Sequence, residues 1–206
     1  MMKKVCIIGI GLIGGSLAKA IKKTHQSEIV FGFGRDKSRL EKALKSNVID
    51  QYSTDIGEAL DGANMVIIAT PVGSYESIFK EMKPHIVEDM IISDVGSTKV
   101  SVIEAVKAVF GNTLDNFIPA HPIAGKEKVG FEVSDADLFV NRKVIITPQE
   151  NNNPDSIKIL AKLWEGVGAE VDFMTPKSHD DLLGMTSHLP HMLAFSLVNY
   201  LISQHP

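Results

Sequence analysis

The 206-residue chain carries a formal net charge of −4 and is 44% hydrophobic and 22% charged, proportions typical of a globular protein with a full core. This charge leaves no basic excess, so nucleic acid is not an expected partner. The single cysteine, Cys6, excludes an internal disulfide and lies in an apolar run, which predicts a reducing, cytoplasmic location.

The N-terminal segment begins with lysines and an apolar stretch, as a signal peptide does, but no small-residue cleavage site follows. A strand followed by a glycine-rich turn explains it better. The other long apolar stretch, 182–202, is interrupted by His188, Pro190, His191 and Asn199, which do not suit a lipid-facing span. We therefore expect no membrane segment.

Short β-rich runs alternate with longer helical patterns along most of the chain. The runs are apolar at nearly every position, which indicates strands buried on both sides. The expected fold is therefore α/β, with a Rossmann-like, doubly wound and mostly parallel sheet. The expected strands are 4–8, 29–33, 65–69, 90–94, 117–120, 143–147 and 170–173.

The strand–helix alternation stops after Phe173, so a domain boundary is expected near Thr175 and Pro176. Residues 1–175 would form a dinucleotide-binding domain. Residues 176–206 would be the first helix of an all-helical second domain, with one long helix running from Ser178.

Another helix start lies earlier in the chain, where Asn153 offers a cap and Pro154 a first-turn proline. The helix that follows is expected over 155–164.

The turn after the first strand reads G-I-G-L-I-G, with Gly9, Gly11 and Gly14 at the dinucleotide-binding spacing around Leu12 and Ile13. Gly9 permits a tight turn, Gly11 lets the backbone approach a pyrophosphate, and Gly14 allows close helix–strand packing. The N-terminus of the following helix would bind the phosphates. A glycine turn kept only for packing is the alternative, and the flanking strand and helix make it weaker.

The end of the second strand carries Gly34, Arg35 and Asp36, where an NAD enzyme usually has an acidic residue for the ribose hydroxyls. A small residue followed by arginine leaves room for a 2′-phosphate and supplies a partner for it, which favours NADP. Asp36 favours NAD, because it would reach a ribose hydroxyl if Arg35 turned to solvent. NADP is the favoured cofactor, with NAD as the alternative.

Three later strand ends carry polar sequence: I-A-T-P-V at 68–72, S-D-V-G-S-T-K at 93–99 and H-P-I-A-G-K-E at 121–127. All should lie at the carboxyl edge of the sheet, where open α/β sheets bind ligands. Ala69, Thr70 and Pro71 would pass beside the cofactor's ribose and nicotinamide, although ordinary loop residues would read the same way.

These motifs, together with G-I-G-L-I-G-G-S-L-A, L-F-V-N-R-K-V-I-I-T-P and S-H-L-P-H, resemble the prephenate and arogenate dehydrogenase family over essentially the whole chain. The resemblance implies oxidative decarboxylation of prephenate to 4-hydroxyphenylpyruvate, a step in tyrosine biosynthesis, with hydride transfer to NAD or NADP. Arogenate is the alternative substrate. In the family the histidine of H-P-x-x-G is catalytic, and it maps onto His121.

A neutral imidazole at His121 would accept or polarise the proton of the substrate hydroxyl. The alternative for His121 is a histidine that only closes a turn. By the same resemblance Ser97 bonds the substrate hydroxyl or His121, and it is also expected to cap the helix running to Phe110. Lys99 is a cation in the first turn of that helix, which suggests an anionic neighbour, substrate or cofactor, with a solvated lysine equally open.

His188 and His191 share one face of the last helix, and the family resemblance implies that they line the substrate site. A zinc site is the alternative, but the H-E-x-x-H pattern is missing and Cys6 sits on the first strand, so no metal is expected. Pro190 should kink the helix and aim His191 inward.

Family members normally continue into a larger helical domain that dimerises and supplies an arginine for the ring carboxylate. In this chain only residues from 178 to about 203 correspond to that helical domain. They form an apolar helix, which needs a partner surface. A homodimer through the C-terminal helix is expected; otherwise the sequence belongs to something longer.

Two rival functions share the early glycine turn. A β-hydroxyacid dehydrogenase of the 6-phosphogluconate type would rely on a lysine in its second domain, whereas this chain has the H-P-I-A-G loop and S-H-L-P-H. A nucleotide-sensing module would bind the cofactor without turnover.

Overall fold

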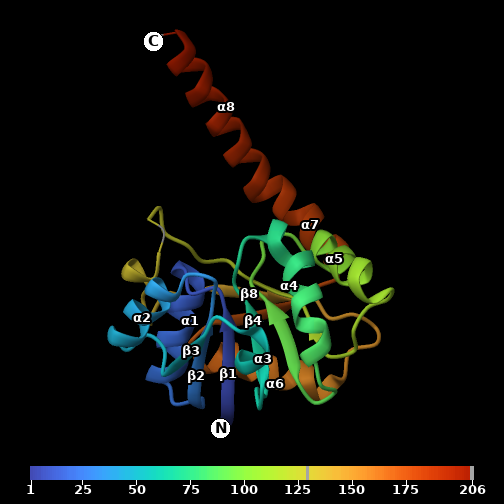
Figure 1. The fold of residues 1–206 in the computed structure, drawn as a ribbon. Coiled ribbons are helices and arrows are strands. Elements are labelled where there is room, and N and C mark those ends of the chain that lie inside the picture. The colour runs from blue at the N-terminus through green and yellow to red at the C-terminus, as the bar shows by residue number, and fades with distance from the viewer. Residues whose placement is uncertain (129, 205–206) are drawn as a thin grey trace.

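The structure is a computed structural model and describes residues 1–128 and 130–204 (Figure 1). Its main sheet is parallel throughout, with the strand order β3-β2-β1-β4-β5-β6. The strands are β1 (Met2–Ile8), β2 (Ser27–Phe33), β3 (Gln51–Ser53), β4 (Met65–Ile68), β5 (Ile91–Asp94) and β6 (Phe117–Ile118).

Helices cover both faces of this sheet, which is why its central strands are apolar at consecutive positions. Val5 and Ile7 of β1 join the core on one face, and Cys6 and Ile8 join the core on the other. The first face packs against α1 (Leu12–Lys23), α2 (Lys37–Lys45) and α6 (Pro154–Gly166). The second packs against α3 (Ile56–Leu60), α4 (Tyr75–Met82) and α5 (Val100–Phe110). The doubly wound α/β prediction is confirmed.

A second, three-stranded sheet was not expected from the sequence. The predicted strand 117–120 divides at Pro119, and the chain leaves the main sheet there. The second sheet has the order β7-β8-β9, with β7 antiparallel and β9 parallel to β8. Its strands are β7 (Ala120–Pro122), β8 (Lys143–Ile146) and β9 (Glu170–Phe173).

Several short elements complete the chain. The strand β3 was missed because it spans three residues at the sheet edge and lacks an apolar run. Short 3₁₀ turns occupy Val72–Ser74, Lys83–His85 and Phe131–Val133. The helix predicted after Asn153 is confirmed, because the Asn153 side chain accepts the Asp155 N–H at 2.8 Å and Pro154 takes the first helical position.

The C-terminal part consists of α7 (Pro176–Leu183), a π-helical turn (Gly184–His188) and α8 (Leu189–Gln204); residues 205–206 lie outside the described part. The helix starts two residues before the predicted Ser178, because the Thr175 hydroxyl caps it by accepting the Ser178 N–H at 3.1 Å. The wide π turn ends at His188, two residues before Pro190, and so accommodates a residue that has no N–H to donate.

α8 projects away from the rest of the molecule (Figure 1), and its apolar side chains are exposed, Met192 by 65% and Phe195 by 68%. No helix within residues 1–128 and 130–204 is long and apolar enough to cross a membrane.

Gly11 and Gly14 of the first turn should respond differently to substitution by alanine. A Cβ on Gly14 would lie 2.2 Å from the Gly9 carbonyl oxygen, whereas a Cβ on Gly11 would meet nothing within 4 Å. We expect Gly14→Ala to lower the free energy of unfolding by about 1–3 kcal/mol through overpacking. Gly11→Ala should change it by about 0.5 kcal/mol or less. Urea unfolding of the two variants side by side tests this, and equal losses of stability would contradict it.

Candidate functional site

Two cavities lie at the carboxyl ends of the strands. The first, the glycine-turn cavity, has a volume of about 420 Å³. It is bounded by the turn after β1 and by the chain segments that leave β2 and β4, the place where open α/β sheets bind ligands. Eight of the predicted cofactor residues line it: Gly9, Gly11, Gly34, Arg35, Asp36, Ala69, Thr70 and Pro71.

The remaining three predicted cofactor residues lie outside this lining. Leu12 and Ile13 pack against the hydrophobic core, and Gly14 is buried where α1 meets the strand. Gly11 precedes α1 and, having no side chain, offers the first-turn N–H groups no side-chain cap. These donors and the open space above Gly11 fit a pyrophosphate at the helix N-terminus.

Two arginines line the glycine-turn cavity. Arg39 of α2 lines it together with Arg35, although the sequence analysis had not selected Arg39. The Asp36 carboxylate accepts the Arg39 backbone N–H at 3.1 Å and so caps α2. Gly34 leaves space beside these groups, since an added Cβ would come no closer than 3.6 Å to Leu40.

The second cavity, the histidine cavity, has a volume of about 450 Å³. It brings together four residues predicted to contact the substrate, from β7, from the loop after β5 and from the C-terminal helices: Ser97, His121, His188 and His191. Their convergence comes from segments about 90 residues apart in sequence, and an apolar wall that includes Leu183 completes the lining.

Lys99 was predicted to contact the substrate, but the structure places it elsewhere. Its side chain is fully buried, and its ammonium lies 2.7 Å from the Asp94 carboxylate. The ammonium also donates to the Ala120 carbonyl oxygen at 2.7 Å. The anionic neighbour expected for this first-turn cation is therefore a protein carboxylate, and the alternative of a solvated lysine is wrong. A buried charge needs such a partner, because desolvation without one is very costly.

Asp94 holds together the segments beneath the histidine cavity. One carboxylate oxygen accepts from the Gly96 N–H at 2.8 Å and the Tyr75 hydroxyl at 3.2 Å, in addition to Lys99. The other accepts the Ala120 N–H at 3.1 Å. Because Ala120 directly precedes His121, this network fixes the strand that carries the imidazole.

Ser97 lines the histidine cavity. It was also expected to cap α5, and that expectation was wrong. The helix begins at Val100, and its cap comes from Asp180 of α7. The Asp180 carboxylate accepts the N–H of Lys99 at 2.7 Å and that of Val100 at 2.9 Å. A carboxylate at a helix N-terminus is favourable because it satisfies free donors and opposes the helix dipole.

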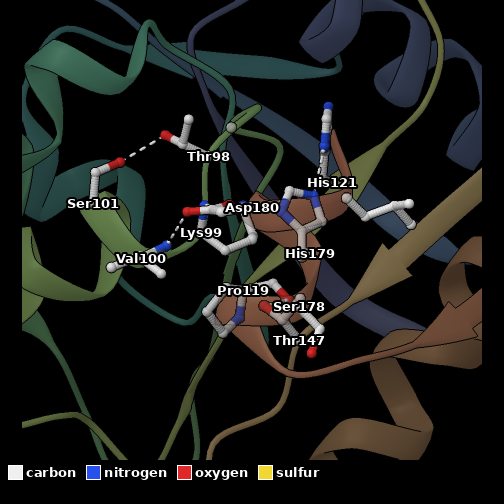
Figure 2. A network of polar contacts seen from close by, with 12 residues as sticks. Thr98, Lys99, Val100, Ser101, Pro119, His121, Thr147, Ser178, His179 and Asp180 are labelled. Atoms are coloured by element: carbon white, nitrogen blue, oxygen red, sulfur yellow. Dashed lines mark hydrogen bonds and ion pairs between the residues drawn. The ribbon is translucent and has the colours of Figure 1, made fainter. Parts of the chain in front are cut away.

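A line of hydrogen bonds leads from the cavity into the protein (Figure 2). His121 Nδ1 lies 2.9 Å from His179 Nε2, and His179 Nδ1 lies 2.7 Å from Asp180 Oδ1. Burial, reinforced by the Lys99 ammonium and by His179, lowers the pKa of His121 to about 3. The imidazole that faces the cavity is therefore neutral at physiological pH.

Acid is expected to destabilise the protein partly through His121. The pKa of His121 is 6.5 in an unperturbed chain and about 3 when folded. Between these values only the unfolded chain binds the proton, so the free energy of unfolding falls as pH drops, by up to about 1.4 kcal/mol per pH unit. Urea unfolding at several pH values should show a shallower pH dependence for His121→Asn. Parallel curves for the two proteins would contradict this origin.

The C-terminal histidines lie where the π turn meets α8. His191 Nδ1 donates to the Ser187 carbonyl oxygen at 2.8 Å, which leaves its Nε2 as an acceptor in the neutral ring. Among residues 1–128 and 130–204, no group of three or more His, Cys, Asp or Glu side chains is arranged to hold a metal ion.

Four polar residues around the two cavities were not predicted from the sequence, namely Arg39, Asp94, His179 and Asp180. Asp94 had a detectable signal, since it ends a buried strand five residues before a lysine. His179 and Asp180 are adjacent at the start of a helix and resemble any solvated pair there. Nothing local shows that this pair reaches His121 and the N-terminus of α5.

Known proteins share this sequence and fold. Residues 17–173 match the family model "Prephenate dehydrogenase, nucleotide-binding domain", and residues 175–205 match "Prephenate dehydrogenase, dimerization domain". The chain is 34% identical to the cyclohexadienyl dehydrogenase of Zymomonas mobilis, over 96% of this chain and 67% of that protein. It is also 34% identical to the prephenate dehydrogenase of Bacillus subtilis, over 97% of this chain and 54% of that protein.

Solved structures agree with these matches. Prephenate dehydrogenase from Aquifex aeolicus, in complex with hydroxyphenyl propionate and NAD⁺, superposes with a TM-score of 0.91 at 34% identity, covering 98% of this chain and 70% of that one. Synechocystis arogenate dehydrogenase gives 0.85 at 28% identity, covering 96% and 68%. The chain spans only about half the length of the Bacillus relative. The chain belongs to the prephenate dehydrogenase family, of which it contains the nucleotide-binding domain.

Proposed function

We propose that the protein oxidises and decarboxylates prephenate to 4-hydroxyphenylpyruvate with a nicotinamide cofactor. The observation that carries this proposal is a neutral imidazole, His121, lining a cavity at the same sheet edge as the glycine-turn cavity. The likeness to the Bacillus prephenate dehydrogenase and to the Aquifex structure supports the choice of reaction.

The substrate chemistry assigns a role to each group in the histidine cavity. Prephenate carries a hydroxyl on C4 of its ring and a carboxylate on C1. His121 accepts the hydroxyl proton as C4 becomes a carbonyl carbon, and Ser97 bonds the same hydroxyl or His121. His188 and His191 line the substrate site, where an imidazole N–H that no protein oxygen accepts can donate to a substrate carboxylate. A bound nicotinamide supplies the hydride acceptor. Loss of carbon dioxide from C1 makes the ring aromatic, which drives the reaction forward.

We infer that the cofactor is NADP, with NAD as the alternative. Arg35 and Arg39 both line the glycine-turn cavity, and a guanidinium group binds phosphate through paired, charge-assisted hydrogen bonds. Asp36, which would favour NAD, already caps α2. The pyrophosphate would lie against Gly9, Gly11 and the N-terminus of α1, and Ala69, Thr70 and Pro71 would border the ribose and nicotinamide.

We also infer a homodimer through the C-terminal helix, in a cytoplasmic protein divided near Thr175 into a dinucleotide-binding part and a helical part. The exposed apolar side chains of α8 require a partner surface, and the family model that matches residues 175–205 is that of a dimerization domain. Sedimentation of the chain with and without residues 189–206 tests this. The same number of chains per particle in the two preparations would contradict it.

Steady-state kinetics tests the reaction directly. Reduced-nicotinamide absorbance is followed with prephenate and with arogenate, each against NAD and NADP, on this chain and on a version that continues past Pro206. We expect a prephenate-dependent rise. Turnover with arogenate alone would select the other substrate, and cofactor binding without turnover of either would favour a sensing module.

A further inference from the structure

His179 lies beside His121, and Asp180 lies beside His179 (Figure 2). Neither His179 nor Asp180 lines the histidine cavity, and the His179 side chain is fully buried. Both belong to α7, which places them in the C-terminal part of the chain. Their hydrogen bonds therefore connect the helical part to the imidazole proposed to accept the substrate proton.

The direction of each hydrogen bond in this line follows from Asp180. Its carboxylate accepts the backbone N–H of Lys99 and of Val100. Burial raises the pKa of Asp180, but these two bonds and the bond from His179 outweigh it, so the pKa is lowered overall. An ionised carboxylate only accepts hydrogen bonds. His179 Nδ1, 2.7 Å from Asp180 Oδ1, must therefore carry a proton.

The charge state of His179 then decides the tautomer of His121. Burial lowers the pKa of His179, and the Lys99 ammonium acts in the same direction, against Asp180 and Asp94. A neutral His179 that is protonated on Nδ1 has a bare Nε2, which only accepts. His121 Nδ1 must therefore be the donor across the 2.9 Å contact. If His179 Nε2 were the donor instead, the neutral His179 ring would point the lone pair of its bare Nδ1 at the Asp180 carboxylate.

We propose that His179 and Asp180 are positioning residues that hold neutral His121 in the Nδ1–H tautomer. The bare nitrogen of His121 is then Nε2, which has no hydrogen-bond partner within residues 1–128 and 130–204. That nitrogen takes the substrate hydroxyl proton, and the resulting imidazolium keeps its Nδ1–H bond to His179. The tautomer is a property of the protein alone, whereas its catalytic consequence rests on the proposed function.

The direct test is nitrogen NMR of the unsubstituted chain at neutral pH, with no substrate present. We expect the His121 imidazole to show a protonated Nδ1 and an unprotonated Nε2. The resonances are assigned by comparison with His121→Asn. Finding the proton on Nε2 would overturn the proposal even if prephenate is turned over. Conversely, the expected tautomer in a protein that does not turn over prephenate would refute only the proposed function.

Variants of His179 test the consequence for catalysis. His179→Leu removes the acceptor, and we expect kcat to fall by roughly 10- to 1,000-fold with KM within about threefold, as for other misoriented histidine bases. His179→Gln restores an acceptor oxygen and should recover at least about tenfold of that loss. An unchanged kcat in His179→Leu, or a Gln variant no better than Leu at equal stability in urea, would overturn the proposal.

Asp180 has a matched neighbour for comparison. Asp180→Asn removes the charge that fixes the direction of the line, so the NMR signals of His121 should show a mixture of tautomers. Asp181→Asn changes an exposed carboxylate that pairs with Lys177 and should leave the signals unchanged. A single Nδ1–H tautomer in Asp180→Asn would exclude the role of Asp180.

Discussion

Replacing His121 with asparagine is expected to lower kcat by about 100- to 10,000-fold, the usual contribution of general-base assistance. KM should change little, because His121 acts on the proton that leaves during the reaction rather than on the substrate carboxylates. Prephenate-dependent reduction of the nicotinamide measures both constants.

The matched control is His25→Asn. His25 is exposed, and its φ of 52° is a backbone conformation that asparagine tolerates well. This variant should keep the kinetics of the unsubstituted protein. Near-normal turnover by His121→Asn, with the His25 control equally active, would contradict the role of His121.

The acid side of the pH profile gives a second measure of the same group. Because burial lowers the pKa of His121 to about 3, its protonation should not reduce kcat/KM between about pH 5 and pH 8. An acid limb with a midpoint near the ordinary histidine value would show that His121 is more exposed during turnover than in the free protein.

Replacing Gly34 with aspartate is expected to lower the affinity for NADP by about 100-fold and to leave the affinity for NAD unchanged or higher. A carboxylate there would repel a 2′-phosphate and weaken its charge-assisted bonds to Arg35 and Arg39, each worth about 1.5–3 kcal/mol. The same carboxylate suits the ribose hydroxyls of NAD. The substitution should fold, since the added Cβ makes only ordinary contacts with Leu40. Fluorescence titration with both cofactors measures the two affinities.

Ser38→Asp is the control for this charge change. Ser38 is exposed on α2 and outside the lining of the glycine-turn cavity, so the variant has the same net charge without an anion in the cavity. It should lose only a small part of the NADP affinity. Equal losses in the two variants would mean that long-range charge, rather than contact with the phosphate, sets the preference. A Gly34→Asp variant that still binds NADP as tightly as before would contradict the proposed cofactor.

The main sheet and the glycine turn were predictable because their signals are local. Runs apolar at every position require cover on both faces, and the glycine spacing reflects contacts between neighbouring turns of chain, such as Gly14 against the Gly9 carbonyl. The cap at Asn153 was equally local. The second sheet was not predictable, since the departure at Pro119 depends on pairing with β8 more than 20 residues later.

The sequence by itself determined the α/β class, the position of the glycine-turn cavity and the motif that contains His121. Only the tertiary structure decided which groups act on that histidine. Lys99 turned out to be the buried partner of Asp94, and the His121–His179 and Lys99–Asp180 contacts join residues 58 and 81 positions apart. Residue type and spacing report on neighbours within a few turns of chain. The charge state of a buried imidazole depends instead on groups that packing brings from distant segments.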